Sequence, residues 1–191
     1  METPMNPLRN LFYLEPDITF LNHGSFGATP RAVLEEYQAW QRRLEAQPVR
    51  FLARESLDYF RAARQDLADY LNADPINLVF IPNATFGVNV VARSFDLQSG
   101  DEILTSNHEY GACENAWSFL AQKHGFQIVQ QEIPLPSPSK EEIVDILWAG
   151  VTGQTRLIFL SHITSPTAIH FPVEKICQRA REAGFPVLVD G

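Results

Sequence analysis

The chain has 191 residues, of which 45% are hydrophobic and 20% are charged, and its formal net charge is −8. This is the composition of an ordinary globular protein that is long enough to bury a sizeable core. The negative balance and the absence of a basic stripe argue against nucleic acid as a partner, because binding to phosphates depends on positive charge. No apolar run is long enough to span a bilayer or resembles a signal peptide, so we expect no membrane association. The two cysteines, Cys113 and Cys177, form no Cys-x-x-Cys pair, which favours a cytoplasmic location without disulfides or a zinc site.

The N-terminal third of the sequence predicts mainly helix. Residues 1–30 are irregular except for a possible short strand at 18–21. Thr29-Pro30 predicts a helix N-cap followed by proline at the first helical position, and this helix should end at Pro48. A second helix is predicted over 55–71. Its inward-facing side chains should be Leu57, Phe60, Ala63, Leu67 and Leu71.

From residue 78 onward, predicted strands alternate with predicted helices. The strands are 78–81, 102–106, 127–130, 157–160 and 187–189, and the helices are 85–95, 111–124, 139–148 and 173–183. Ser139 and Glu142 form a capping box for the third of these helices. The alternation predicts an α/β fold with a mostly parallel sheet covered by helices on both faces. Because a finished domain rarely ends on a core strand such as 187–189, we expect the chain to be the first part of a longer enzyme.

Ligands of open parallel sheets bind beyond the carboxyl ends of the strands, so the strand-to-helix junctions are the candidate sites. At the first junction, Asn83-Ala84-Thr85 opens a helix whose N–H groups and dipole favour an anion, and Thr85 adds a hydroxyl donor. The glycine pattern for dinucleotides and the Walker lysine are both absent, so a single phosphate is the better fit. Alternatively, Asn83 and Thr85 only cap the helix.

Two further junctions carry side chains that suit a planar ligand. His108, Glu109 and Tyr110 follow the 102–106 strand, and either ring could stack on such a ligand, although a simple polar loop explains them as well. His162 follows the 157–160 strand within a run of hydroxyl residues, and no nucleophile elbow surrounds Ser161. With Asp190 at the end of the last strand, the junctions together predict an anionic, flat ligand that contains nitrogen. Its phosphate would lie at Thr85, its ring against Tyr110 or His108, and its ring nitrogen opposite Asp190.

The same segments match a known family. They are Phe20 to Pro30, Asn83 to Thr85, Gly100 to Tyr110, Ser161 to Thr167 and Leu188 to Gly191. In this order and spacing, the chain resembles the class V aminotransferase family of enzymes that depend on pyridoxal 5'-phosphate (PLP). The closest resemblance is to the isopenicillin N epimerase-like branch, and it covers essentially the whole chain. It implies the PLP-dependent transferase fold of type I. Residues 1–30 would then border the active site, and 31–191 would be part of the PLP-binding large domain. The rest of that domain and a smaller C-terminal domain would be absent. A homodimer is also implied.

The resemblance assigns expected roles to individual residues. Ala84 and Thr85, with Asn83 beside them, should bind the cofactor phosphate, and Asp190 should pair with the pyridine nitrogen. Tyr110 falls where cysteine desulfurases place a histidine against the ring, which argues against a desulfurase, and His108 is the alternative stacking residue. The remaining expected site residues are Ser165 and His162 near the ring oxygen, and Asn22, His23 and Gly24 at the substrate pocket.

The implied chemistry begins at the cofactor ring. An ionised Asp190 would keep the pyridine nitrogen protonated, so that the ring withdraws electrons from the α-carbon of an amino-acid substrate. The expected catalytic residues are Asp190, Tyr110 and His162. PLP enzymes also use a Schiff-base lysine. The three lysines of this chain, Lys123, Lys140 and Lys175, are predicted on helices and not at a strand end, so that lysine is expected beyond Gly191.

Three functions remain open at this stage. The first is a PLP-dependent enzyme of the epimerase or class V aminotransferase type, which acts on an amino acid through its α-carbanion. The second is a carbon–sulfur lyase or an enzyme like a cysteine desulfurase, since the same half-site would serve it. The third is a truncated module that binds PLP or phosphate without catalysis.

Overall fold

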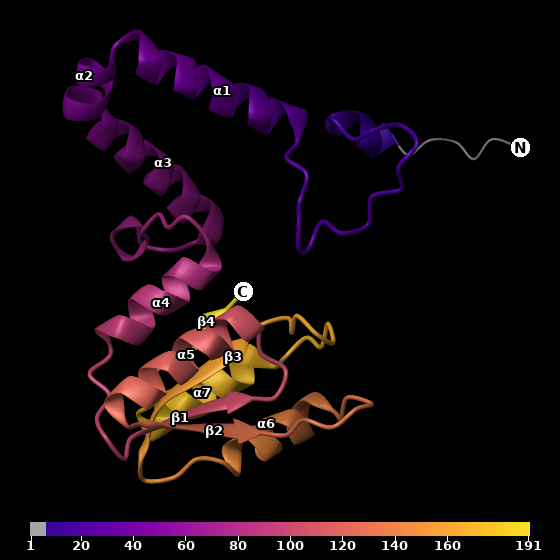
Figure 1. The fold of residues 1–191 in the computed structure, drawn as a ribbon, viewed down its shortest axis with the longest axis vertical. Helices are drawn as coiled ribbons and strands as arrows, with labels where there is room; N and C mark the ends of the chain where they lie inside the picture. Colours follow the sequence, from indigo (N-terminus) through magenta and orange to yellow (C-terminus); the bar gives the residue numbers. More distant parts are fainter. Residues whose placement is uncertain (1–6) are drawn as a thin grey trace, which may run out of the picture. The chain divides into compact units, whose positions relative to one another are not determined.

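The computed structural model describes residues 7–191. Contacts between backbone positions divide the chain into two compact units, Met1–Val79 and Phe80–Gly191. Each unit is described by itself below, and the element labels are those of Figure 1. The expected division into a segment 1–30 and a domain 31–191 stays a prediction.

The first unit is helical, and both of its predicted long helices are confirmed. Its elements are η1 (Pro7–Leu11), α1 (Arg31–Ala46), α2 (Pro48–Arg50), the π-helical turn η2 (Phe51–Glu55), α3 (Ser56–Leu71) and η3 (Pro75–Asn77). The N-cap of α1 is Pro30, which makes no side-chain capping bond, so the prediction of Thr29 as the cap was wrong by one residue. Gln47 leaves the helical region (φ −156°) and Pro48 starts α2, because the fixed φ of proline suits a first helical position.

Two sequence predictions fail in this unit. Residues 18–21 form no strand, and the only bridge nearby joins Phe12 to Pro30. The predicted inward side chains of α3 are exposed, with Leu57 at 68% and Phe60 at 57%, whereas Ala68 is the buried residue of this helix. The apolar spacing correctly predicted a helix, but spacing alone does not tell which element covers the apolar face.

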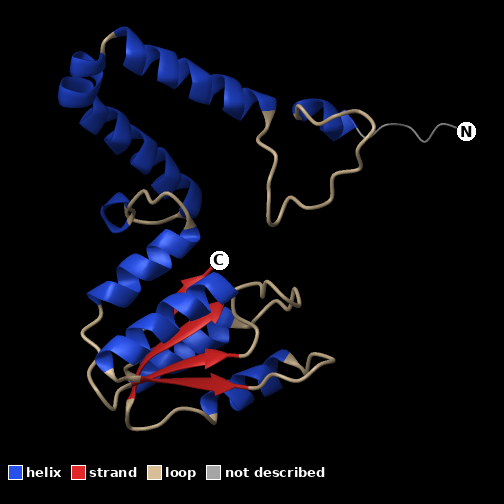
Figure 2. Ribbon diagram, in the orientation of Figure 1, coloured by secondary structure: helices blue, strands red, loops and turns tan. Residues whose placement is uncertain are grey.

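The second unit is built on a parallel four-stranded sheet, as predicted (Figure 2). Its strands are β1 (Glu102–Ser106), β2 (Gln127–Gln131), β3 (Thr155–Ser161) and β4 (Val187–Asp190), in the order β2-β1-β3-β4. A helix follows each of β1, β2 and β3 and returns the chain to the same end of the sheet, which is the connection that parallel pairing requires. All carboxyl ends of the strands therefore lie along one edge.

Helices cover both faces of this sheet, and alternation along the strands separates two cores. The helices are α4 (Ala84–Ser94), α5 (Gly111–His124), α6 (Lys140–Trp148) and α7 (Val173–Ala183). Ile103 of β1 packs with α4 and α5, whereas the next residue, Leu104, packs with α6 and α7, because successive strand side chains point to opposite faces. Ser139 and Glu142 form the predicted capping box of α6.

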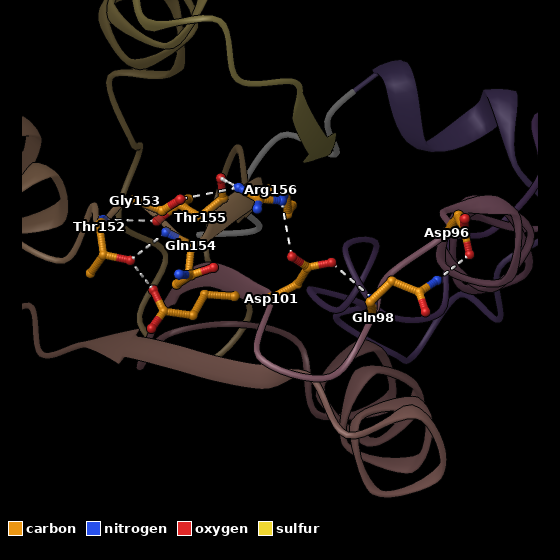
Figure 3. Close-up of polar contacts among 9 residues, drawn as sticks. Asp96, Gln98, Asp101, Thr152, Gly153, Gln154, Thr155 and Arg156 are labelled. Atoms are coloured by element: carbon orange, nitrogen blue, oxygen red, sulfur yellow. Dashed lines mark hydrogen bonds and ion pairs between the residues drawn. The ribbon is translucent and has the colours of Figure 1, made fainter.

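A polar network fastens the amino ends of two strands (Figure 3). Arg156 at the start of β3 forms an ion pair with Asp101 (2.9 Å), and Asp101 also accepts a hydrogen bond from the backbone N–H of Gln98 (2.8 Å). Thr152 donates to Glu102 at the start of β1. These contacts hold the loop after α4 and the loop before β3 at the end of the sheet opposite the candidate site.

The predicted strand at 78–81 is not formed, and this prediction was wrong. Val79 and Phe80 are exposed at 79% and 51%, and the segment pairs with none of the four strands. A strand needs a hydrogen-bonding neighbour as well as an apolar sequence. No helix within residues 7–191 is both long and apolar enough to cross a membrane.

Candidate functional site

The site is built at the carboxyl ends of β1, β3 and β4. Ser106 ends β1, and Ser161 and Asp190, which end β3 and β4, are register partners in the parallel pairing. The backbone N–H that follows β3, on His162, donates to the Asp190 carbonyl at 2.7 Å. Three polar side chains from distant parts of the sequence are thereby brought to one edge of the sheet.

A buried carboxylate joins two of these strand ends. Glu109, which is 4% exposed, accepts hydrogen bonds from the Ser106 hydroxyl (2.5 Å), the Ser161 backbone N–H (2.6 Å) and the Ser161 hydroxyl (2.7 Å). Burial raises the pKa of Glu109 above its ordinary range, and the hydrogen bonds from the two serines oppose that rise. In the sequence, Glu109 stood out only as part of a polar run, and no role was predicted for it. The structure shows it as a link between β1 and β3.

His108 is also enclosed by the protein. Its Nε2 lies 2.8 Å from the carbonyl oxygen of Ile133, and its Nδ1 lies 2.8 Å from the Thr167 hydroxyl. A carbonyl can only accept, so Nε2 carries a proton, and in the neutral ring Nδ1 accepts from Thr167. The ring is 4% exposed. Both nitrogens are therefore satisfied internally, which favours a structural role for His108 over the alternative stacking role.

Tyr110 lies at the entrance of α5 and is the more accessible ring. It is the N-cap residue of that helix and is 45% exposed. Its carbonyl accepts hydrogen bonds from the backbone N–H groups of Cys113 (2.9 Å) and Glu114 (3.0 Å). This fixes the backbone of Tyr110 while its side chain stays accessible at the same edge of the sheet.

The first turn of α4 has the geometry of an anion site. Asn83 is its N-cap, and the Asn83 side chain accepts a hydrogen bond from the backbone N–H of Phe86 at 2.8 Å. The N–H groups of Ala84 and Thr85 in the same turn have no acceptor within the helix. The capping interpretation of Asn83 is thus confirmed, and it is compatible with an anion at the two remaining N–H groups.

Cys113 connects α5 to Asp190. Its thiol is completely buried in the first turn of α5, and its Sγ lies 3.6 Å from Oδ2 of Asp190. The first turn of α5 and the end of β4 therefore meet at one buried sulfur atom, and α4 packs against both elements. The sequence analysis did not single out Cys113 for the site.

His162 and Ser165 lie on the loop after β3. The His162 ring is 4.7 Å from the ring of His170, and a side-chain Cβ added at Gly191 would come within 3.2 Å of the Cβ of His162. Ser165 is exposed in the turn that follows. His162 is therefore next to Asp190, whereas no contact in the described chain joins Ser165 to the other site residues.

The expected substrate residues Asn22, His23 and Gly24 belong to the first unit. There the Asn22 carbonyl accepts from the backbone N–H of Phe26 (3.0 Å), and the His23 ring packs against Phe12 and Phe20. Gly24 has open space around the position of a Cβ. Their role at a substrate pocket stays a prediction.

A cavity of about 460 Å³ lies away from these strand ends, where α4 and α5 terminate. It is lined by residues that include Arg93, Asp96, Lys123 and His124. The carbonyl ends of two helices face this region, and such ends are an unfavourable place for an anion. This cavity is therefore a poorer candidate for binding an anionic ligand than the strand ends.

Comparison with known proteins identifies the family of the chain. The family model for the class V aminotransferases matches residues 20–191. The chain belongs to this family. It is 34% identical to the isopenicillin N epimerase of Streptomyces clavuligerus over 96% of this chain and 46% of that protein. It is 37% identical to the isopenicillin N epimerase of Amycolatopsis lactamdurans, over 93% of this chain and 45% of that protein. The chain thus spans about half the length of the curated relatives it matches.

Solved structures support the same fold. A variant of C-DES with glycine covalently linked to its PLP cofactor superposes with a TM-score of 0.85 at 26% identity. The match covers 97% of this chain and 50% of that one. A second C-DES structure, described as a cystine C–S lyase in complex with cysteine persulfide, gives a TM-score of 0.82 at 26% identity. The fold is therefore that of PLP-dependent enzymes, and PLP is the cofactor of this family.

The residues of the site fit this cofactor. The first turn of α4 offers N–H groups to a phosphate, Asp190 offers a carboxylate to a ring nitrogen, and Tyr110 offers an accessible aromatic ring. The contact of the buried Cys113 thiol with Asp190 joins the start of α5 to the end of β4, and α4 packs against both elements. The three lysines lie on α5, α6 and α7, as predicted, and none lies at a strand end.

Proposed function

We propose that the protein containing this chain is a PLP-dependent enzyme that changes bonds at the α-carbon of an amino acid, in the manner of the epimerase-like branch. The observation that carries the proposal is the position of the Asp190 carboxylate at the end of β4, 3.6 Å from the thiol of Cys113 in the first turn of α5, with α4 packed against both elements. The relatives with 34% and 37% identity support the epimerase-like assignment. When bound, PLP withdraws electrons from the α-carbon of an amino acid, which weakens the bonds at that carbon.

Different residues of this chain would bind the phosphate, the ring nitrogen and the ring face of the cofactor. Ala84 and Thr85 would donate their N–H groups to the phosphate, and the positive end of α4 would add to its binding. The Asp190 carboxylate would hold a proton on the ring nitrogen, because an adjacent negative charge favours the protonated base. Tyr110 would pack against the ring from α5.

His162 is our candidate for moving a proton near the substrate. It follows β3, its backbone N–H is fixed on the Asp190 carbonyl, and its ring lies beside His170. An imidazole ring has one nitrogen that can accept a proton and one that can donate it, which is what moving a proton requires. Ser165 lies three positions later on the exposed part of this loop and is proposed to contact the cofactor or the substrate.

A carbon–sulfur lyase is the second candidate, and the C-DES structures are the specific observation in its favour. The two candidates differ in their products. An epimerase inverts the α-carbon without forming a keto acid, whereas a lyase releases pyruvate and a reduced sulfur compound from a cysteine derivative. Chiral chromatography of an amino-acid panel, with pyruvate and sulfide assays on the same samples, separates them.

Borohydride reduction followed by intact-mass measurement tests the PLP assignment itself. The expected result for the natural protein is one reduced PLP adduct on a lysine. A protein that binds PLP reversibly and gives no adduct would be the non-catalytic module considered above, and the enzymatic proposal would be abandoned. We also propose a homodimer, following the family resemblance, and sedimentation velocity tests that point.

A further inference from the structure

Cys113 is a buried core residue that also contacts a carboxylate. It is 0% exposed and packs in the apolar cluster with α4 and α5, yet its Sγ lies 3.6 Å from a carboxylate oxygen of Asp190. A thiol is a weak donor and a carboxylate is a strong acceptor, so the hydrogen bond runs from the S–H group to Asp190. Cys113 thus joins the first turn of α5 to the carboxylate at the end of β4.

The protonation state of the thiol is compatible with this direction of the bond. Burial, with the nearby charges of Asp190 and Glu109, raises the pKa of Cys113 to about 12. The thiol therefore keeps its proton throughout the neutral range and remains a donor. The same protonation makes Cys113 a poor nucleophile, because the thiolate is the reactive form.

We propose that Cys113 is a positioning residue that donates its S–H to Asp190 and holds this carboxylate toward the ring nitrogen of the cofactor. The proposal rests on the function proposed above. Asp190 ends β4 and is only half-buried, so its side chain has alternative rotamers toward solvent. A hydrogen bond from the rigid first turn of α5 selects one of them.

A role in packing alone makes different predictions, and two variants separate the two roles. Cys113→Ser keeps a donor, whereas Cys113→Ala removes it, and the two side chains differ by one hydroxyl group. If Cys113 positions Asp190, the serine variant should bind PLP within about twofold of the wild type. The alanine variant should bind about five- to tenfold more weakly, the range for loss of one hydrogen bond. The Asp190→Asn background should remove most of the difference between serine and alanine, because the charged acceptor is gone.

The S–H stretching band in the infrared spectrum gives a readout that needs no cofactor. The difference spectrum between the protein and its Cys113→Ser variant isolates the band of Cys113 from that of Cys177 and of any cysteine outside residues 1–191. A donated hydrogen bond lowers the frequency of this vibration. We expect the band of Cys113 to move to higher frequency when Asp190→Ala removes the acceptor. This measurement also decides the matter if Cys113→Ala fails to fold.

The outcomes distinguish this inference from the proposed function. Equal PLP affinities for the serine and alanine variants, or an S–H band that Asp190→Ala does not move, would overturn the role of Cys113 while PLP binding stands. A wild-type protein that binds no PLP would contradict the proposed function, and the positioning role would fall with it. Weak binding by alanine, recovery by serine and a shifted band together establish the inference.

Discussion

The side chain of Glu109 accepts two hydrogen bonds from Ser161, a residue 52 positions later in the chain, one from its backbone N–H and one from its hydroxyl. A third bond comes from Ser106. The carboxylate therefore fastens the end of β3 to the end of β1 beneath the candidate site. Removing this buried acceptor should cost folding free energy, because each of its three donors would be left without a hydrogen bond.

Removal of this carboxylate should destabilise the fold strongly. We expect Glu109→Ala to lower the free energy of unfolding by about 2–4 kcal/mol, since it leaves buried donors without an acceptor. Urea denaturation followed by circular dichroism measures the change. Glu132→Ala is the matched control, because Glu132 is exposed just after β2, and its effect should stay within about 0.5 kcal/mol. Equal effects of the two substitutions would show that the Glu109 network does not stabilise the sheet.

The pH dependence of stability should carry a signature of Glu109. Burial raises its folded-state pKa above the ordinary value of 4.5, so between these two pKa values the folded state binds more protons than the unfolded state. Glu109 therefore contributes stability below pH 4.5, and this contribution is lost as the pH rises through the raised pKa.

Glu109→Gln, which cannot ionise, tests this sign. Relative to the variant, the wild type should lose stability as the pH increases across this window. Glu141 and Glu142, whose pKa values are lowered mainly by hydrogen bonds from Lys175 and Ser139, give a slope of opposite sign. They are present in both proteins and cancel in the difference. A wild type that instead gains stability over the variant with rising pH would mean that the hydrogen bonds outweigh burial.

A side chain at Gly150 should be poorly accommodated. A Cβ at this position would lie 2.6 Å from Cδ1 of the buried Leu104 and would also meet the amide of Gln131. We expect Gly150→Ala to cost about 1–3 kcal/mol through overpacking. Gly153→Ala is the control in the same loop, because nothing lies within 4 Å of its added Cβ. Thermal melts of the two variants give the comparison, and a Gly150→Ala protein as stable as its control would refute the tight packing.

The capping box of α6 is a further quantitative test. The Ser139 hydroxyl accepts from the backbone N–H of Glu142 (3.2 Å), and the Glu142 carboxylate accepts from the backbone N–H of Ser139 (2.9 Å). Ser139→Ala should lower stability by about 1 kcal/mol, which is typical for loss of an N-cap. Ser137→Ala, two positions earlier in the exposed loop, should have little effect. If both variants melt together, the box contributes nothing to the fold.

The successes and failures of the sequence analysis have physical causes. The strands and helices from residue 102 onward were predicted nearly to the residue because strand-helix alternation and local caps such as Ser139 carry enough information. The strands at 18–21 and 78–81 were wrong because an apolar run does not reveal whether another strand will pair with it. The inward face of α3 was wrong for the same reason, since no spacing rule shows which element covers a helix.

The candidate site was only partly visible from the sequence. The positions of Asp190 at the end of a strand, and of Tyr110 and the 83–85 turn at the starts of helices, could be predicted, whereas their roles in binding a cofactor stay predictions. The links between them could not. Glu109 with Ser161 and Cys113 with Asp190 are pairs separated by 52 and 77 positions, and only the folded sheet brings them together. The sequence did offer one indication that Cys113 lies near the site. Cys113 lies three residues after Tyr110 and therefore in the first turn of the predicted helix.

The measurement that tests the central claim most directly is the PLP affinity of the protein with and without the Asp190 carboxylate. Fluorescence titration should compare the wild type with Asp190→Ala and with Asp145→Ala, an exposed residue of α6 that pairs with Arg179. We predict that Asp190→Ala weakens PLP binding at least about tenfold, the effect expected for a hydrogen bond to a charged group, and that Asp145→Ala has no effect. If the Asp190→Ala protein bound PLP as tightly as the wild type, the cofactor site would not lie at the end of β4.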